Sequence, residues 1–216
     1  MIWLIGCKGM LGTEIARQFK ENNIEYTGTD IDVDITNPEA LDKFASSLNN
    51  LQYIINCSAY TAVDKAESDI ELATKLNVNG PENIAAVAKK YGAKMIHIST
   101  DYVFDGTGNT PRTEDMPVAP IGVYGVTKAD GEKAVAATTK EYYILRTAWL
   151  YGWAGKNFVY TIHQLEPDFG WIIVYVKTYY SFTVLCINDA KKDSTRHRII
   201  VFKLIFGCRL KIIKHY

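Results

Sequence analysis

A tyrosine and a lysine lie four positions apart in the stretch 124–128 (Tyr-Gly-Val-Thr-Lys), and Thr100 lies upstream of them. Residues four apart share one face of a helix, so the Lys128 ammonium can lower the pKa of the Tyr124 phenol from about 10 toward neutral pH. A hydroxyl such as Thr100 would add a second hydrogen bond to a carbonyl oxygen, although the ordinary role of such a residue is to cap a helix. Together these residue types suit the reduction of a ketone, provided that a hydride donor binds beside them.

Three glycines follow a short apolar stretch near the N-terminus, in the order Gly6-Cys7-Lys8-Gly9-Met10-Leu11-Gly12. Glycine permits a tight turn and lets the backbone approach a pyrophosphate, which the positive end of the next helix stabilises. Asp30 ends the second predicted strand, where a carboxylate can bind the adenosine ribose or serve as an ordinary turn residue. The segment 31–35 has no basic residue to bind a 2′-phosphate, which favours NADH.

Strand-like and helix-like segments alternate along the first two thirds of the chain. Apolar runs predict strands, and apolar residues at helical spacing predict helices. The predicted strands are 2–6, 25–30, 53–57, 94–99 and 142–146, and the predicted helices are 10–22, 38–48, 78–91 and 127–138. This alternation implies an α/β fold with a doubly wound parallel sheet of the Rossmann-like class. The long segment 106–122, rich in Pro, Gly and Thr, is expected to be a functional loop.

Polar residues near the ends of the predicted strands are further candidates. The segment 56–64 leaves the third strand at its carboxyl end, where it either passes close to a cofactor or forms a simple turn. Asn77 is expected to cap the following helix rather than to belong to a site. His97 is expected to pack on a sheet face. His163 and His197 have no partner at a ligand spacing, so no metal site is predicted.

Composition limits the classes of partner. The 216 residues include 24 basic and 24 acidic side chains, a formal net charge of zero that argues against nucleic acid or an anionic membrane as the main partner. The four cysteines, Cys7, Cys57, Cys186 and Cys208, form no C-x-x-C pair and are expected to be reduced thiols. The N-terminus has no basic region typical of a signal peptide, so the expected location is the cytoplasm.

The character of the chain changes at about Gln164. Residues 171–187 form a β-prone run, and 191–216 mix Lys, Arg and Ile without amphipathic order. Lys177 and other polar residues interrupt the apolar run, which does not resemble a membrane span. We therefore expect a cofactor-binding domain over 1–163 and an aberrant tail over 164–216.

Several motifs follow one another in the order of a known enzyme family. They are the glycine turn, 59–67 (Ala-Tyr-Thr-Ala-Val-Asp-Lys-Ala-Glu), 99–106 (Ser-Thr-Asp-Tyr-Val-Phe-Asp-Gly), the pair Tyr124 and Lys128, and 146–149 (Arg-Thr-Ala-Trp). From residue 1 to about 161 the chain resembles the dTDP-4-dehydrorhamnose reductases, which are extended short-chain dehydrogenases/reductases. The string at 99–106 is highly specific for that family.

The resemblance implies a function and a set of site residues. Such enzymes reduce the 4-keto group of dTDP-4-dehydro-L-rhamnose with NADH or NADPH, giving dTDP-L-rhamnose for cell-surface polysaccharide. The implied catalytic residues are Thr100, Tyr124 and Lys128. The implied cofactor-binding residues are Gly6, Gly9, Met10, Leu11, Gly12, Asp30, Asp34, Ile35, Ser58, Ala59, Tyr60, Tyr124 and Lys128. The implied substrate-binding residues are Thr100, Asp101 and Trp149. A nucleotide sugar is the implied partner, and a homodimer stays open.

The chain also departs from the family. Its members continue through a sugar-binding region with an Asp-Gln-x-Gly-x-Pro-Thr-type motif, and no such motif follows residues 157–160. We expect a frameshifted, truncated or wrongly joined reading frame that leaves the substrate region incomplete. Two other functions stay open. One is a non-catalytic NAD(P)-binding regulatory subunit resembling that of methionine adenosyltransferase, and the other is an epimerase or dehydratase acting on a nucleotide sugar.

Overall fold

The protein is described from a computed structural model. The model describes residues 1–108, 111–152, 154–155 and 157 with their side chains. Three further strands, Trp171–Thr178, Ser181–Asn188 and Ile199–Phe202, are described as backbone. The rest of 164–216 lies outside the described residues, as do His163, His197 and Cys208, so the expectations for them are not tested.

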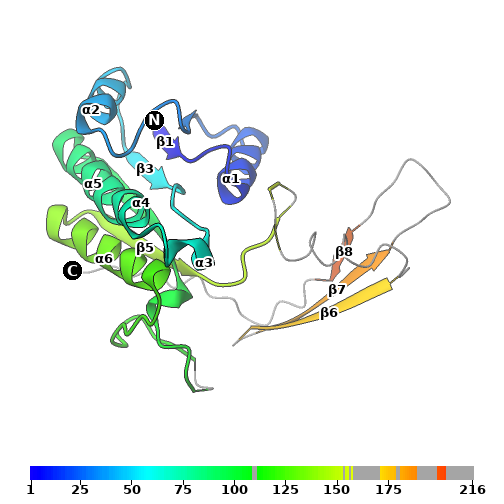
Figure 1. Cartoon of the computed structure of the whole chain (residues 1–216). Helices are drawn as coiled ribbons and strands as arrows, with labels where there is room; N and C mark the ends of the chain where they lie inside the picture. Colours follow the sequence, from blue (N-terminus) through cyan, green and yellow to red (C-terminus); the bar gives the residue numbers. More distant parts are fainter. Residues whose placement is uncertain are drawn as a thin grey trace.

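A parallel five-stranded sheet forms the centre of the fold (Figure 1). Its strands are β1 (Ile2–Ile5), β2 (Tyr26–Thr29), β3 (Tyr53–Asn56), β4 (Lys94–Thr100) and β5 (Tyr142–Thr147), in the order β2-β1-β3-β4-β5. Every neighbouring pair is parallel, which confirms the predicted doubly wound α/β class. Each predicted strand is present, and its ends differ from the prediction by no more than one residue.

Four long helices connect these strands: α1 (Met10–Glu21), α2 (Pro38–Ser46), α5 (Gly80–Tyr91) and α6 (Val123–Thr138). Helix α1 lies on the opposite side of the sheet from α2, α5 and α6 (Figure 1). Helix α2 begins as predicted, because Asn37 Oδ1 accepts a hydrogen bond from the Ala40 N–H at 3.0 Å and Pro38 occupies the first turn. Helix α6 begins earlier than the predicted residue 127, so both Tyr124 and Lys128 lie within it.

Four short elements were not predicted from the sequence. They are α3 (Val63–Ala66), α4 (Ile70–Thr74), the π-helix η1 (Lys75–Asn79) and the 3₁₀-helix η2 (Asp101–Val103). Each is too short to show the apolar repeat that reveals a helix in a sequence. The segments 106–108 and 111–122, expected to be a loop, contain no strand and no helix.

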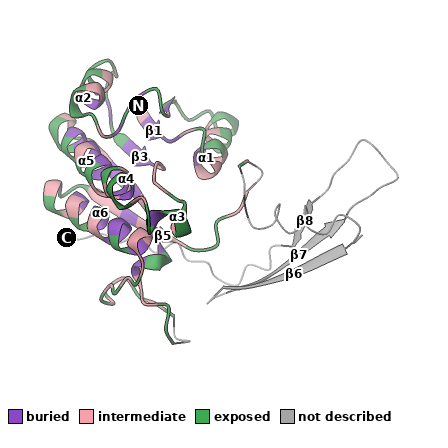
Figure 2. Cartoon of the chain, viewed as in Figure 1, coloured by how far each residue is buried: buried purple, intermediate pink, exposed green. Residues whose placement is uncertain are grey.

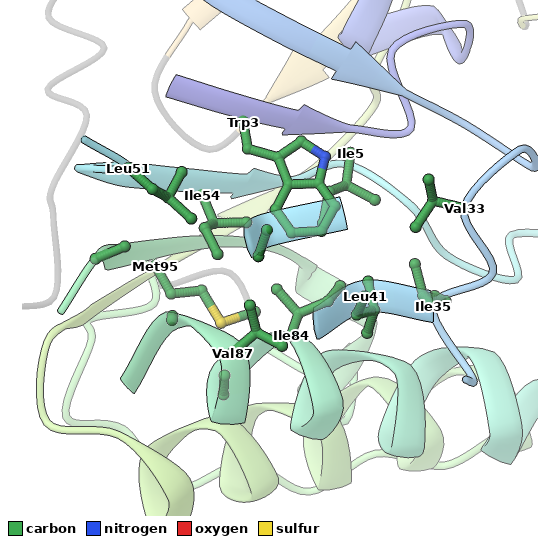
Figure 3. Packing of buried hydrophobic residues seen from close by; sticks show 14 of the residues in the cluster. Trp3, Ile5, Val33, Ile35, Leu41, Leu51, Ile54, Ile84, Val87 and Met95 are labelled. Atoms are coloured by element: carbon green, nitrogen blue, oxygen red, sulfur yellow. The ribbon is translucent and has the colours of Figure 1, made fainter. Parts of the chain in front are cut away.

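The hydrophobic core lies between the sheet and the helices α2 and α5. Trp3 and Ile54 from the sheet contact Leu41 and Ile84 from these helices, and all four are fully buried (Figure 3). The Trp3 indole N–H, which would be costly to bury unpaired, donates a hydrogen bond to Thr29 Oγ1 at 2.8 Å. Figure 2 shows the buried residues on the faces of α5 and α6 that cover the sheet.

Two glycines let α6 approach its neighbours closely. A Cβ at Gly131 would lie 2.0 Å from the carbonyl oxygen of Asn77 in η1, and one at Gly125 would lie 2.3 Å from the carbonyl oxygen of Tyr102 in η2. Both separations are far below van der Waals contact. Glycine at these two positions therefore allows α6 to pack beside the carboxyl end of β4, where the candidate catalytic residues lie.

The segment after the parallel sheet contains a second sheet. Strands β6 (Trp171–Thr178), β7 (Ser181–Asn188) and β8 (Ile199–Phe202) pair antiparallel in the order β6-β7-β8. The predicted β-prone run at 171–187 is thus confirmed as two strands. Among the described residues, no helix combines the length and the hydropathy that a membrane crossing requires.

Candidate active site

A cleft of about 1050 Å³ lies at the carboxyl ends of β1, β3 and β4, the edge where doubly wound sheets bind their ligands. Segments far apart in the sequence line it, from the glycine turn to the start of α6. Of the predicted site residues, it brings together Gly6, Gly9, Met10, Leu11, Asp30, Asp34, Ile35, Ser58, Ala59, Thr100, Asp101, Tyr124, Lys128 and Trp149. Gly12 and Tyr60 do not line the cleft.

The glycine turn is shaped by two close backbone approaches. Gly6 has a φ of 77°, in the left-handed region, and a Cβ there would lie 2.8 Å from the Ser58 nitrogen. A Cβ at Gly12 would lie 2.1 Å from the Gly6 carbonyl oxygen. Gly12 therefore packs directly against the backbone of the turn and does not face the cleft. Helix α1 begins after Gly9 with no side-chain cap, so its first N–H groups are open to a ligand.

Asp30 connects the end of β2 to the glycine turn. Its Oδ2 accepts a hydrogen bond from the Lys8 N–H at 2.9 Å, and its Oδ1 accepts one from the Ile31 N–H at 3.0 Å. Asp34, also in the cleft, accepts hydrogen bonds at 2.8 Å from both the N–H and the hydroxyl of Thr36. This end of the cleft therefore presents two carboxylates.

Thr100, Tyr124 and Lys128 meet at the other end of the cleft. Thr100 is the last residue of β4, and its Oγ1 accepts a hydrogen bond from the Tyr102 N–H at 3.2 Å, so its capping role is also present. The same hydroxyl donates to Asp101 Oδ1 at 3.1 Å and lies within hydrogen-bonding reach of the Tyr124 phenol. Tyr124 and Lys128 lie on one face of α6, as predicted.

The prediction that the Tyr124 pKa is lowered is wrong for this structure. Burial of the phenol raises its pKa above the usual value, and the nearby Asp101 and Tyr102 raise it further, while the Thr100 hydrogen bond opposes them. Tyr102 also packs edge-on against the Tyr124 ring, with centroids 5.5 Å apart. Tyr124 is therefore protonated at neutral pH.

The position of the Lys128 side chain explains why the pKa of Tyr124 is not lowered. Its side chain is only 2% exposed, and its Nζ donates a hydrogen bond to the Ile98 carbonyl oxygen at 2.7 Å. Burial lowers the pKa of Lys128 to about 8, and the charge of the Glu132 carboxylate opposes that effect. Its ammonium is thus held against the β4 backbone rather than aimed at the phenol alone.

Asp101 and Trp149, the candidate substrate-binding residues, also line the cleft. Burial raises the pKa of Asp101, and hydrogen bonds from Thr100 and from backbone N–H groups oppose that effect. Trp149 is 56% exposed and has a φ of 52°, a left-handed conformation that is strained for a bulky residue. Such strain is common at ligand sites.

Sequence reasoning named the segment 56–64 but did not single out Asn56, which shapes the cleft. Asn56 ends the otherwise apolar strand β3, and its Oδ1 accepts hydrogen bonds from the Ser58 N–H at 3.0 Å and the Ser58 hydroxyl at 2.5 Å. Its Nδ2 lies 3.2 Å from Nδ1 of His97, which is fully buried, as expected for a packing residue. A buried amide at the end of an apolar strand was the signal that could have identified it.

Asn77 and Tyr60 differ from their predicted roles. Asn77 does not cap a helix. It is fully buried in η1, where its Oδ1 accepts from the Tyr60 N–H at 2.8 Å and its Nδ2 donates to the Tyr60 carbonyl at 3.2 Å and to Thr127 Oγ1 at 3.1 Å. The Tyr60 phenol donates to Asp69 Oδ2 at 2.9 Å, away from the cleft. The two residues join the segment after β3 to α6.

Among the residues with described side chains, no three His, Cys, Asp or Glu groups are placed to hold a metal ion. The cysteines Cys7 and Cys57 are free thiols. Burial raises the pKa of Cys57 to about 12, so its thiol is unreactive despite its place in the cleft.

Comparisons with known proteins agree with this geometry. The chain is 42% identical over 177 residues to a probable dTDP-4,6-dihydroxy-2-methyloxan-3-one 4-ketoreductase of Streptomyces antibioticus, covering 81% of this chain and 60% of that protein. It is 41% identical over 176 residues to the dTDP-4-dehydrorhamnose reductase of Escherichia coli, covering 77% and 57%. The chain thus spans about three fifths of the length of these relatives.

Solved structures of dTDP-4-dehydrorhamnose reductases are also similar to this chain. A dTDP-4-dehydrorhamnose reductase of Clostridium acetobutylicum has a TM-score of 0.74 and 46% identity, covering 81% of this chain and 62% of that chain. The Bacillus anthracis enzyme, solved in complex with NADP, has a TM-score of 0.75 and 35% identity with the same coverage. The family model described as the RmlD substrate binding domain matches residues 1–182. The match covers most of the chain, which therefore belongs to this family.

Proposed function

We propose that this chain carries the cofactor-binding and catalytic part of an NAD(P)H-dependent dTDP-4-dehydrorhamnose reductase. The reaction would convert the 4-keto group of dTDP-4-dehydro-L-rhamnose to the hydroxyl of dTDP-L-rhamnose. The observation that carries the proposal is the convergence of Thr100, Tyr124 and Lys128 in one cleft with the glycine turn. The names of relatives at about 40% identity support the same reaction.

The residues of the cleft fit a dinucleotide cofactor. The glycine turn leaves no room for side chains, and the open start of α1 suits a pyrophosphate at Gly9, Met10 and Leu11. Asp30, Asp34 and Ile35 would surround the adenosine. When bound, NADH or NADPH supplies the hydride that is added to the carbonyl carbon.

Ser58 and Ala59 would flank the cofactor further along the cleft, and Lys128 would hold the nicotinamide ribose. Tyr60 is left out of this set because its side chain is directed to Asp69. Ser58 is fixed by two hydrogen bonds to Asn56, which prepares its backbone for a ligand before one binds.

Tyr124 would act as the general acid. Its raised pKa keeps the phenol protonated, so it can donate a proton to the oxygen that gains negative charge. Thr100 would donate a hydrogen bond to the same oxygen. The phenolate left behind would be stabilised by the positive charge of Lys128, which lines the same cleft.

Thr100, Asp101 and Trp149 would contact the sugar of the substrate. All three line the cleft, and Thr100 and Asp101 lie beside Tyr124, which supports this assignment. The reductase names of the relatives do not favour the regulatory-subunit alternative. A cytoplasmic location and a homodimer rest on the sequence alone, and fractionation of cells and sedimentation of the purified chain would test them.

Substitution of the general acid tests this function. Tyr124→Phe removes one hydroxyl from a buried ring, so the fold and the affinity for NADH should be retained. Oxidation of NADH by dTDP-4-dehydro-L-rhamnose should fall by a factor of about 10² to 10⁴, the usual contribution of a positioned acid. The measurements are the loss of dihydronicotinamide absorbance and the fluorescence change on NADH binding.

Tyr91→Phe is the matched control. The Tyr91 hydroxyl bonds to Asp42, on helices remote from the cleft, so its removal should leave turnover unchanged. Near-normal turnover by Tyr124→Phe would refute the catalytic assignment. No turnover by the unchanged chain, with NADH bound, would refute the reductase function of this chain.

A further inference from the structure

Helix α6 carries a third ionisable residue, Glu132, on the face that holds Tyr124 and Lys128. Glu132 lies one helical turn beyond Lys128, so the three side chains form a row on the helix. Glu132 is only 7% exposed. A buried carboxylate is stable only when it is paired and hydrogen-bonded.

The partners of Glu132 come from two neighbouring strands. Ser99 in β4 donates its hydroxyl to Glu132 Oε1 at 2.5 Å. Arg146 in β5 forms a two-pronged ion pair, with Nε 2.9 Å from Oε1 and Nη2 2.6 Å from Oε2. Ser99 and Arg146 lie directly opposite each other in the sheet, and the guanidinium of Arg146 lies 5.1 Å from the centre of the Phe104 ring. One carboxylate thus joins α6 to two adjacent strands.

The backbone that Glu132 holds is the backbone that carries the site. Ser99 is followed by Thr100 and preceded by Ile98, whose carbonyl accepts the hydrogen bond from Lys128. The Thr147 hydroxyl donates to the Ser99 carbonyl at 3.1 Å and ties the same point to β5. Any movement of this stretch relative to α6 would change the separation of Thr100 from Tyr124.

We propose that Glu132 is a positioning residue for the reaction. By holding Ser99 and Arg146, its carboxylate fixes the end of β4 against α6 and so sets Thr100, Tyr124 and Lys128 in register. The same carboxylate is the nearby anion that favours the charged form of Lys128. The kinetic part of this inference rests on the proposed function, and the electrostatic part does not.

The charge of Lys128 gives a readout that a purely structural role would not affect. The titratable groups that interact with it are Cys57 after β3, His97 on β4 and Glu132 on α6, and the Arg146 guanidinium on β5 is paired with Glu132. Cys57 and His97 are buried and neutral at neutral pH, because burial raises the thiol pKa to about 12 and lowers the imidazole pKa well below its usual value. Glu132 is therefore the negatively charged group whose removal should lower the pKa of Lys128.

The test compares Glu132→Gln with the unchanged chain in two measurements. Gln keeps the size of the side chain and an oxygen for the Ser99 hydroxyl, but loses the charge. We expect kcat to fall on the order of 100-fold, as for a small misplacement of catalytic groups, with the KM for NADH little changed. We also expect the pKa of Lys128, followed by NMR of labelled lysine side chains, to fall below its value of about 8.

Two further variants sharpen the result. Asp130→Asn is the matched control, because Asp130 is a carboxylate on the same helix whose 2.8 Å partner is Lys133 on the surface. It should leave both measurements unchanged. Ser99→Ala keeps the ion pair and removes the tie to β4, so it should lower kcat while the pKa of Lys128 stays the same.

Each outcome decides the proposal. If Glu132→Gln fails to fold because Arg146 is left unpaired, the double change Glu132→Gln with Arg146→Met removes both charges and replaces it in the kinetic measurement, where kcat should still fall. A folded variant with unchanged kcat and unchanged Lys128 pKa overturns the positioning role. If the unchanged chain oxidises no NADH, the proposed function fails, and an unchanged Lys128 pKa still overturns the role of Glu132.

Discussion

Burial favours the neutral form of both Tyr124 and Lys128, so it raises the pKa of the phenol and lowers the pKa of the ammonium, and this decides how the site depends on pH. Removing a phenol from water favours its neutral form, which is the form that can donate a proton. Removing an ammonium from water also favours its neutral form, but here that form lacks the positive charge needed beside a new phenolate. The group that limits activity at high pH is therefore Lys128 rather than Tyr124.

A pH profile of kcat tests this assignment. The pKa of Lys128 is lowered from 10.5 to about 8, so its charged, active form is lost as the pH rises through about 8. We expect kcat to be level below that pH and to decline above it, well before the raised pKa of Tyr124 is reached. A level profile continuing to about pH 10 would show that the charge of Lys128 is not required.

The sequence identified the chemistry of these residues but not their electrostatics. The spacing of Tyr124 and Lys128 correctly predicts a shared helix face. It does not show that Lys128 would be drawn to the Ile98 carbonyl on another element, or that Asp101 would lie close enough to raise the pKa of the phenol. Such effects depend on contacts between segments far apart in the chain.

At the scale of elements, the alternation of strands and helices was enough to predict the sheet. The strands β1 and β3 are short runs rich in apolar residues, and β2, β4 and β5 combine β-branched or aromatic residues with polar ones. The linkage between β3 and α5 was not predicted, because α3, α4 and η1 are short and held by tertiary contacts. The Asn77 amide is one such contact, since it joins the Tyr60 backbone to Thr127 in α6.

The glycine turn provides a graded test at this scale. A Cβ at Gly12 would lie 2.1 Å from the Gly6 carbonyl, whereas one at Gly9 would lie 3.3 Å from it. Gly12→Ala should therefore push α1 away from the turn, abolish NADH binding and destabilise the fold by several kcal/mol, as overpacking does at its upper range. Gly9→Ala should reduce NADH affinity with little loss of stability.

Urea unfolding and NADH titration of the two variants measure these effects. Gly9 has an extended backbone that alanine can adopt, which makes Gly9→Ala the matched control for the fold. Equal stability of the two variants would contradict the close packing of α1 on the turn.

For the whole molecule, the proposed division is a cofactor-binding unit over 1–163 and a tail over 164–216. Among the residues with described side chains, those that line the cleft lie between 5 and 155, and the chain spans about three fifths of its relatives' length. The family match, however, continues to residue 182, beyond this boundary. The sequence could place the boundary only by composition, because the tail has no periodic pattern.

Removal of 164–216 tests the division. Since the glycine turn, Asp30 and Ser58 all lie in the first unit, the shortened chain should bind NADH as tightly as the whole chain does. Isothermal titration of both chains would measure this. A loss of NADH affinity of tenfold or more, about 1.4 kcal/mol, would show that the tail belongs to the cofactor-binding unit.

The central claim is that one cleft brings a carbonyl group, a hydride donor and the Tyr124 proton together. The most direct measurement is isotope transfer from NADH deuterated at the transferable position of the nicotinamide to dTDP-4-dehydro-L-rhamnose. We expect the unchanged chain to form dTDP-L-rhamnose that carries deuterium on C4 of the sugar, and Tyr124→Phe to form little or none of this product. A product without deuterium at C4 would contradict hydride transfer from the cofactor. Formation of the labelled product by Tyr124→Phe at the rate of the unchanged chain would contradict the role of the Tyr124 proton.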